Sequence, residues 1–333
     1  MPASESLLLA PFKGITTKAW RNAFSRHVEG FDQIYAPFIS GVGDTRINPS
    51  KLQDIIPISD NLSPTIPQFI STNAKEIILL GKTLQDHGYD HMNWNLGCPF
   101  TRIAEKFRGC GILPYPQMLE EILNEVFAKL TIKLSIKTRL GYKNPEEIYT
   151  ILEVLNNYPI HSIILHTRTG KQLYRGNTDP DAFSTCRNIS LHPMVYNGDI
   201  YNLPGFLTLK SAFPDLTTWM LGRGALMNPF LPMEIKGHLL SDSEKRTRLT
   251  AFHKDLFDNA RQSIPQEKKH LGWMKAIWYY MSGVFSDGEK LFRNIKRTSS
   301  ISEYHQSVEH ALDQPFSDHS QQEHYFKHSI KHI

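Results

Sequence analysis

The sequence contains little cysteine and no long apolar segment. Its 333 residues include three cysteines (Cys98, Cys110 and Cys186), too few for a disulfide framework, which favours a reducing compartment. No stretch approaches the roughly 20 apolar residues of a membrane-spanning helix. The first residues lack the basic segment and the apolar run of a secretory signal peptide. We therefore expect a cytoplasmic protein that does not associate with membranes.

The sequence also lacks a strong excess of charge of one sign. Lys and Arg number 37 and Asp and Glu 33, which gives a net charge of +4. This small excess does not by itself predict nucleic-acid binding, because the clustering of charges matters more than their sum. No segment indicates an obligate protein partner, so we expect a monomer.

Short apolar runs recur over the first two thirds of the chain, and most are followed by an amphipathic segment. Alternation of strands with helices predicts parallel βαβ units, and eight strands predict an α/β fold, a closed (β/α)8 TIM barrel. The segment 38–64 is irregular and fits this pattern least. The expected strands lie at 7–11, 33–38, 65–70, 91–96, 132–138, 162–167, 193–198 and 217–222.

The pattern changes after about residue 240, where only helical spacing remains. We predict a catalytic barrel over 1–240, a C-terminal all-helical domain over 241–312 and a polar tail over 313–333. The tail carries His319, His324, His328 and His332, whose spacing could suggest a metal site. No cysteine or carboxylate completes a ligand set, so we expect a loosely packed, solvated tail and no metal site.

Polar residues and glycines follow the apolar strands, at the end where barrel enzymes place their active sites. Asn197–Asp199 and Gly222–Gly224 follow the last two strands and suit a phosphate, although glycines also end strands without any ligand. Lys137 and His166 can donate hydrogen bonds to an electron-rich ring, although a histidine there could simply cap its strand. Gln68 can both donate to and accept from an amide-like edge. These groups suit the pyrimidine ring of a flavin.

Six motifs occur in order along the barrel: "APFKGIT", "NWNLGCPF", "IKTRLGY", "HTRTGKQLYRG", "NGDI" and "GRGALMNP". Together they resemble the tRNA-dihydrouridine synthase family, FMN enzymes that reduce a uridine in tRNA. The helical part, with "KAIWYYM" and "KLFRNIKR", resembles more weakly the RNA-binding domain of the bacterial C-type subgroup. That subgroup implies position 16 of the D-loop as the target. Two departures are the segment "RGCGILPYP", which contains Cys110, and Lys13 in the first motif.

The resemblance implies a role for each matching residue. Cys98 would protonate C5 of uracil while reduced FMN delivers a hydride to C6, with NADPH or NADH as reductant. The expected FMN contacts are Pro11, Phe12, Lys13, Gln68, Lys137, His166, Asn197, Gly198, Asp199, Gly222 and Arg223. The expected tRNA contacts are Asn95, Arg139, Arg168, Lys275, Arg293, Lys296 and Arg297.

Cys98 is suited chemically to the role of an acid. A cysteine with a pKa of about 8.5 is mostly a thiol at pH 7, whereas a carboxylic acid would need a large upward shift to remain protonated. A turn of Gly97, Cys98 and Pro99 after a strand can hold the thiol over one face of a base. The alternative is a buried structural cysteine.

The RNA-binding surface is expected in the helical domain. Arg293, Lys296 and Arg297 are spaced three and four apart, so they can share one helix face and contact phosphate, or they can form a solvated face. Two other functions remain open. One is an FMN barrel that reduces a small molecule, such as a dihydroorotate or enoate reductase, and the other is an RNA-binding barrel without catalysis.

Overall fold

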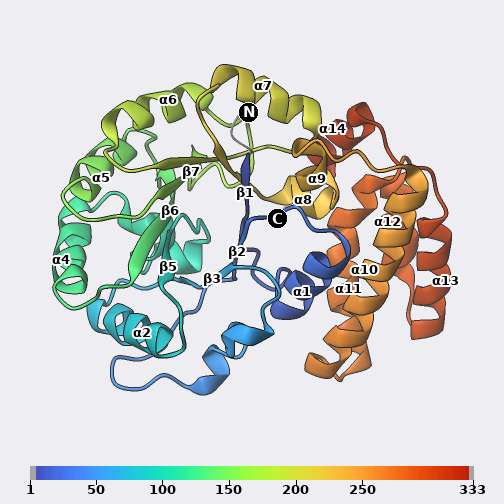
Figure 1. Ribbon diagram of the computed structural model, residues 1–333, viewed down its shortest axis with the longest axis horizontal. Helices are drawn as coiled ribbons and strands as arrows, with labels where there is room; N and C mark the ends of the chain where they lie inside the picture. The colour runs from blue at the N-terminus through green and yellow to red at the C-terminus, as the bar shows by residue number, and fades with distance from the viewer. Residues whose placement is uncertain (1–4, 330–333) are drawn as a thin grey trace. The chain divides into compact units, whose positions relative to one another are not determined.

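The structure, a computed structural model, describes residues 5–329 and consists of one parallel sheet with helices around it (Figure 1). The last four residues of the predicted tail, including His332, lie outside the described residues. No helix in the described part of the chain combines the length and the apolar character needed to cross a bilayer.

Nine strands form a nearly closed TIM barrel, in the order β3-β2-β1-β9-β8-β7-β6-β5-β4. The third expected strand is divided at Pro67, which has no N–H for a sheet ladder. Its first part pairs with β2 and its second with β5, so the eight expected strands are all present. The strands are β1 (Ser6–Leu9), β2 (Gln33–Tyr35), β3 (Thr65–Ile66), β4 (Gln68–Phe69), β5 (His91–Leu96), β6 (Lys133–Gly141), β7 (Ile163–Thr169), β8 (Met194–Asn197) and β9 (Thr218–Leu221).

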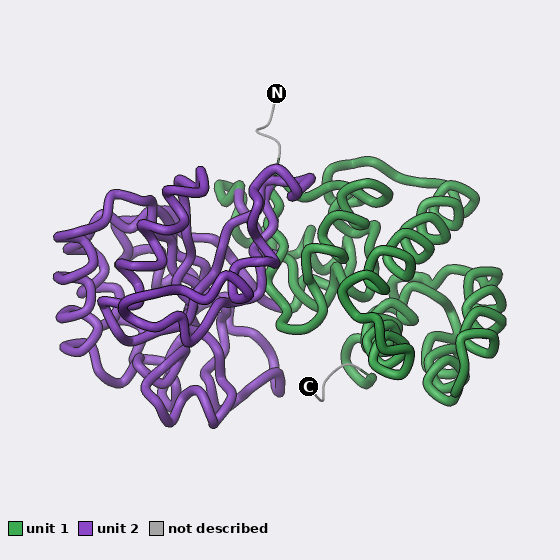
Figure 2. Tube along the Cα trace, turned by 90° about the horizontal axis from the view of Figure 1, so that it is seen from below, with its two compact units in different colours: residues 1–32, 199–217, 221–333 green, residues 33–198, 218–220 purple. Residues whose placement is uncertain are grey.

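The chain divides into two compact units, which Figure 2 colours separately. Unit 2 comprises residues 33–198 and 218–220, and the described part of unit 1 comprises residues 5–32, 199–217 and 221–329. The irregular segment 38–64 in unit 2 contains two single-turn helices, η1 (Pro49–Lys51) and η2 (Ile58–Asp60), and one β-bridge from Ile39 to Phe69.

Helices with one apolar face cover the strands of unit 2 (Figure 1). Each packs against the next along the chain, in the order α2, α4, α5 and α6. The helices are α2 (Ala74–Asp86), α3 (Thr101–Ala104), α4 (Pro116–Phe127), α5 (Glu147–Leu155) and α6 (Pro180–Ile189), with the short η3 (Gly109–Ile112) between α3 and α4.

Unit 1 combines β1 with the helices of the C-terminal region. Its core is aromatic: Trp20 stacks on Phe24, and both rings meet Phe252 edge to face. These contacts pack α1 against α10. The helices are α1 (Lys18–His27), α7 (Leu203–Ala212), α8 (Arg223–Met227), α9 (Leu231–Ile235), α10 (Asp242–Ser263), α11 (Glu267–Met281), η4 (Ser282–Val284), α12 (Gly288–Arg297), α13 (Ile301–Leu312) and α14 (His319–His328).

The segment expected to be a solvated tail contains α14. Asp318 begins this helix with a capping box to Gln321, and Tyr325 and Phe326 are both 5% exposed. The ring of Phe326 stacks on Tyr201, with centroids 4.5 Å apart. Two adjacent aromatic residues do not make an apolar stripe of helical period, so the sequence pattern does not indicate this packing.

Candidate active site

The side chain of Asn95, at the end of β5, holds the turn that carries Cys98. Its Oδ1 accepts hydrogen bonds from the N–H groups of Gly97 (3.0 Å) and Cys98 (2.9 Å). Its Nδ2 donates to Oε1 of Gln68 at 2.8 Å. One amide therefore fixes the turn and connects it to the neighbouring strand β4.

Arg139, on β6, holds the same turn from the opposite neighbour. Its Nε donates to the carbonyl of Gly97 (3.0 Å), and its Nη1 donates to the carbonyls of Thr169 (2.8 Å) and Leu173 (2.7 Å). The side chain is 2% exposed. The predicted contacts of Asn95 and Arg139 with the target base stay predictions. In the structure, both side chains form hydrogen bonds with the backbone of the Cys98 turn.

A second segment packs directly on Cys98. The N–H of Cys110 donates to the carbonyl of Cys98 at 3.1 Å, and the thiol of Cys110 lies 3.3 Å from the same oxygen. Gly109 has a φ of +59°, and a Cβ at this position would lie 2.5 Å from that carbonyl oxygen. Only glycine fits both the conformation and the space. This segment departs from the family pattern, but its sequence does not indicate that Gly109 contacts Cys98.

The two thiols differ in access although both are protonated near neutral pH. Desolvation raises the pKa of Cys98, while the N–H of Phe100 and the charges of Arg139 and Arg102 oppose the rise. Desolvation raises the pKa of Cys110 to about 12. Cys98 is 7% exposed and Cys110 is fully buried. Of these two thiols, only Cys98 has exposed surface.

Lys137, on β6, is half-buried and donates from Nζ to Oδ1 of Asn197 at 2.8 Å. Desolvation, followed by the charge of Arg139, lowers the pKa of this lysine to about 7. Nδ2 of Asn197 donates to the carbonyl of Met220 at 2.8 Å. The ammonium group keeps two further N–H groups for an electron-rich ligand.

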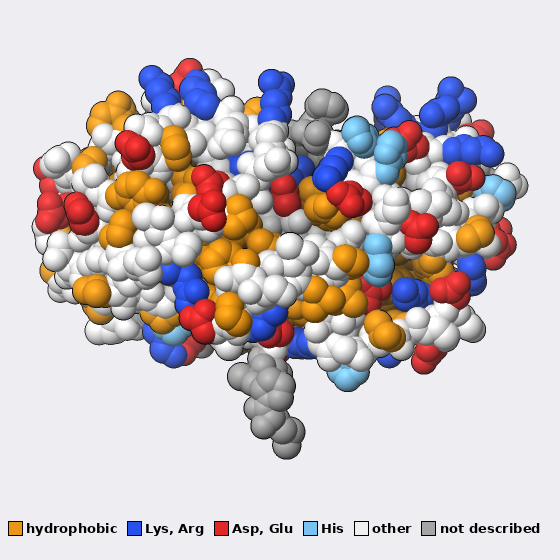
Figure 3. Space-filling view, turned by 90° about the horizontal axis from the view of Figure 1, so that it is seen from above, with side chains coloured by type: hydrophobic (Ala, Val, Ile, Leu, Met, Phe, Trp, Pro, Cys, Tyr) orange, Lys and Arg blue, Asp and Glu red, His pale blue; other side chains and the backbone are white. Residues whose placement is uncertain are grey.

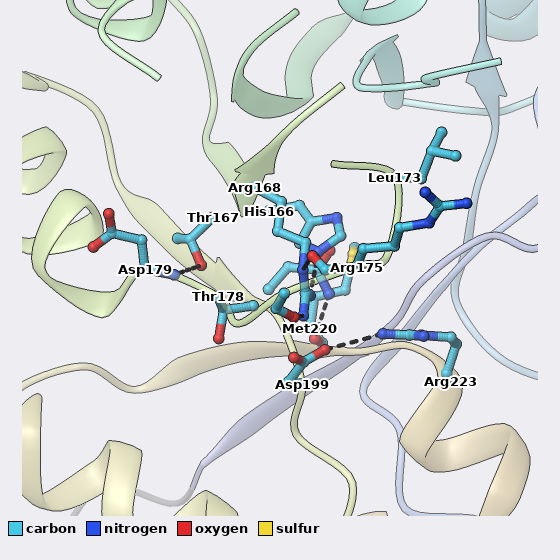
Figure 4. A network of polar contacts seen from close by, with 12 residues as sticks. His166, Thr167, Arg168, Leu173, Arg175, Thr178, Asp179, Asp199, Met220 and Arg223 are labelled. Atoms are coloured by element: carbon cyan, nitrogen blue, oxygen red, sulfur yellow. Dashed lines mark hydrogen bonds and ion pairs between the residues drawn. The ribbon is translucent and has the colours of Figure 1, made fainter. Parts of the chain in front are cut away.

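His166 and Arg168, at the end of β7, contact each other (Figure 4). The guanidinium of Arg168 lies 3.2 Å from Nε2 of His166 and also donates to the carbonyls of Arg175 and Gly176. Because a guanidinium has only donors, Nε2 must be the acceptor, so the ring proton lies on Nδ1. Arg168, expected to contact tRNA, is 1% exposed and supports the segment that follows its strand.

Gln68 is completely buried, and both ends of its amide are engaged within unit 2. Its Nε2 donates to Oδ1 of Asn93 at 2.7 Å, and its Oε1 accepts from Asn95. Gly198 is also tightly packed, since a Cβ there would lie 2.6 Å from a methyl group of Thr178. The predicted flavin contacts of these two residues stay predictions.

In unit 1, Arg223 is held between a charge and an aromatic ring. Its Nη2 lies 3.0 Å from Oδ1 of Asp199 (Figure 4), and its guanidinium carbon lies 4.6 Å from the centre of the Phe326 ring. Gly222 begins α8 beside the ring of Phe12. The sequence did not indicate Phe326, because α14 was not expected.

The other expected residues of unit 1 lie at its surface. Pro11 and Phe12 are half-buried and Lys13 is exposed, in a turn where the N–H of Phe12 donates to Oγ1 of Thr16. Lys275 donates to the carbonyl of Thr298, just beyond the end of α12. The three expected cations of α12, Arg293, Lys296 and Arg297, are exposed.

Comparison with known proteins identifies the family. A sequence model described as dihydrouridine synthase (Dus) matches residues 8–321. This chain belongs to that family. It is therefore an enzyme, a flavin-dependent oxidoreductase that acts on uridine.

Curated relatives are similar over most of their length. A tRNA-dihydrouridine(16) synthase of Ralstonia nicotianae is 25% identical over 323 residues, covering 92% of this chain and 96% of the relative. A tRNA-dihydrouridine synthase B of Shewanella oneidensis is 25% identical, covering 80% of this chain and 85% of the relative. A probable tRNA-dihydrouridine synthase of Rickettsia conorii is 23% identical, covering 86% and 87%.

Solved structures agree with the barrel fold. Histamine dehydrogenase from Rhizobium sp. 4-9 matches with a TM-score of 0.53 and 12% identity, covering 76% of this chain and 50% of the other. At this identity the likeness concerns the fold alone.

The donors of unit 2 fit a flavin. Lys137 has spare N–H groups and a depressed pKa, so an electron-rich ligand would favour its charged form. The predicted flavin contact of His166, whose Nε2 accepts from Arg168, stays a prediction. The predicted contacts in unit 1, which are Pro11, Phe12, Lys13, Asp199, Gly222 and Arg223, stay predictions.

We predict that Gly109→Ala disturbs the Cys98 turn. Gly41 has nearly the same backbone conformation (φ +61°) with no atom within 4 Å of an added Cβ, so Gly41→Ala serves as the control. Gly41→Ala should cost ~1–2 kcal/mol of stability, and Gly109→Ala ~1–3 kcal/mol more because of the clash. Thermal melting and the rate of Cys98 alkylation measure the effect. Equal losses in the two variants, with unchanged alkylation, would show that Gly109 does not position Cys98.

Proposed function

We propose that this enzyme reduces a uridine of tRNA to 5,6-dihydrouridine, with non-covalent FMN and with NADPH as reductant. The observation that carries the proposal is the protonated, partly accessible thiol of Cys98 on a turn fixed by Asn95 and Arg139. The relatives named as tRNA-dihydrouridine synthases support the choice of substrate. The relative named for position 16 spans 92% of this chain and supports position 16 as the target.

Cys98 acts in this proposal as the acid that protonates C5 of uracil. Bound reduced flavin would supply the hydride for C6. Lys137 and Nδ1 of His166 would donate to the flavin ring, while Asn197 orients Lys137 through the 2.8 Å hydrogen bond. Burial raises the pKa of the Cys98 thiol, so the thiol carries its proton until C5 of uracil accepts it.

The thiolate left after proton transfer has several stabilising neighbours. The N–H of Phe100 and the positive charges of Arg139, Arg102 and Lys137 all favour the charged form of Cys98. Burial favours the protonated thiol before the reaction, and these groups stabilise the thiolate after it. Cys98 can therefore both lose and regain its proton. Uptake of one proton from water completes each cycle, so uridine, NADPH and a proton give dihydrouridine and NADP⁺.

The central role of Cys98 is tested by two alanine variants. Cys98→Ala should still bind FMN and undergo flavin reduction by NADPH, but form dihydrouridine ~10²–10⁴-fold more slowly, as expected for a lost general acid. Cys110→Ala should slow the reaction far less, because its thiol is fully buried. Single-turnover reduction of unmodified tRNA measures both. Similar losses in the two variants would contradict the assignment of the acid to Cys98.

The surface of α12 favours RNA over a small molecule as substrate. Leu291 and Ile295 bury one face, whereas Arg293, Lys296 and Arg297 are exposed on the other. None of these cations has a hydrogen-bond or ion-pair partner among residues 5–329. On the face drawn in Figure 3, Lys and Arg side chains and Asp and Glu side chains are spread over the whole surface. An uncompensated cationic surface suits phosphate groups.

Replacing Arg293, Lys296 and Arg297 together by alanine should weaken tRNA binding and flatten its log–log salt dependence by up to about two units. FMN content and melting temperature should not change, since these side chains bond to nothing else in the described chain. Alanines at Lys75, Lys82 and Lys129, which are exposed in unit 2, remove the same charge elsewhere and should keep the salt slope. A slope unchanged in the α12 variant would reject the anchoring role.

A further inference from the structure

The chain that follows Cys98 exposes three large aromatic side chains. Phe100, Phe107 and Tyr115 are 44%, 43% and 46% exposed. The rings of Phe107 and Tyr115 meet edge to face, with centroids 5.0 Å apart. Burial of such rings would favour folding, so their exposure in one short segment, residues 99–116, calls for another explanation. We refer to this segment as the post-cysteine loop.

The same loop carries cations that are not compensated. Arg102 and Lys106 are exposed and Arg108 is half-buried. None of the three has a hydrogen-bond or ion-pair partner for its side chain in the described chain, and Glu105 is the single carboxylate of the loop. Aromatic rings interleaved with free cations are typical of surfaces that bind single-stranded nucleic acid.

The backbone conformation of Phe107 also points to a role for its side chain. Phe107 has a φ of +56°, and the N–H groups of Phe107 and Arg108 bond to carbonyls of α3. Glycine normally occupies such a position at the end of a helix. A phenylalanine kept there against its conformational preference, with its ring half in solvent, is typical of a functional residue.

The loop is fixed close to Cys98 at its beginning and again at Cys110. It begins at Pro99, directly after the cysteine, and Cys110 within it bonds to the Cys98 carbonyl. Arg102 lies near enough for its charge to lower the pKa of Cys98. A uridine that reaches Cys98 must leave its stack in tRNA, and its neighbours then lose a stacking partner.

We propose that the post-cysteine loop binds the nucleotides that flank the target uridine. The rings of Phe107 and Tyr115 stack on unpaired bases, and Arg102 and Lys106 contact phosphates. This inference rests on the proposed function and adds a second RNA-binding surface, on unit 2, to the basic face of α12. It assigns recognition near the reacting base to the loop and affinity for the tRNA backbone to α12.

Phe107→Gly is the most informative variant, because glycine relieves the unfavourable backbone conformation while removing the ring. It should keep the melting temperature and FMN content of the wild-type protein but weaken binding of an unmodified tRNA transcript by roughly 5- to 100-fold. Phe107→Trp should restore binding, because any large ring can stack. Tyr115→Ala should behave as Phe107→Gly does.

The controls separate stacking from a general loss of aromatic surface. The rings of Phe127 and Tyr158 form another pair in unit 2, 5.7 Å apart on α4 and after α5, so their double alanine variant should leave tRNA affinity unchanged. Arg102→Gln with Lys106→Gln should reduce the salt slope by up to about two. Competition by a perfect RNA duplex should be unaffected by Phe107→Gly, since its bases are not available for stacking.

If the wild-type protein forms dihydrouridine and Phe107→Gly and Tyr115→Ala bind tRNA with normal affinity, the stacking role of the post-cysteine loop is overturned and the proposed function is left intact. A joint fall of melting temperature, FMN content and tRNA affinity in Phe107→Gly, not restored by Phe107→Trp, would also overturn it, by showing that the ring supports the fold. A wild-type protein that neither binds tRNA nor reduces its uridine rejects both proposals.

Discussion

The chemistry proposed for this enzyme depends on the hydrogen bonds that fix Gly97 and Cys98. The amide oxygen of Asn95 takes both N–H groups of the turn, and the guanidinium of Arg139 takes the carbonyl of Gly97. These bonds satisfy the polar groups of a strand end that would otherwise face a dry interior. They also hold the backbone of the turn in place, so the Cα–Cβ bond of Cys98 keeps one direction.

The support for this turn extends into the strands themselves. Gln68 links Asn93 to Asn95, and Ser135 accepts from Asn93 at 2.8 Å and lies 2.7 Å from Nε2 of His91. Burial lowers the pKa of His91 to about 4, so this histidine is neutral in the network. Buried polar groups that are all hydrogen-bonded define one arrangement of neighbouring strands, which gives Cys98 a rigid base.

The sequence alone predicted the strands well because each is a short apolar run ended by a turn. It also indicated the exposed face of α12, since Leu291 and Ile295 alternate with cations at helical spacing. The bonds of Arg139 could not be predicted in this way, because its carbonyl partners, Gly97, Thr169 and Leu173, are distant along the chain. The packing of Phe326 on Arg223 was not predicted for the same reason. The contact of Gly109 with Cys98 was not predicted because it depends on how the backbone folds back after the cysteine.

The central claim is that Cys98 is a protonated acid at working pH. The direct measurement is the rate of Cys98 alkylation from pH 6 to 11, followed by mass spectrometry of the peptide. The fully buried Cys110 and Cys186 provide internal references in the same protein. The account predicts that the alkylation rate rises with an apparent pKa above the ordinary value of about 8.5. A rate that already reaches its plateau at pH 7 would show a thiolate at Cys98 and would contradict the account.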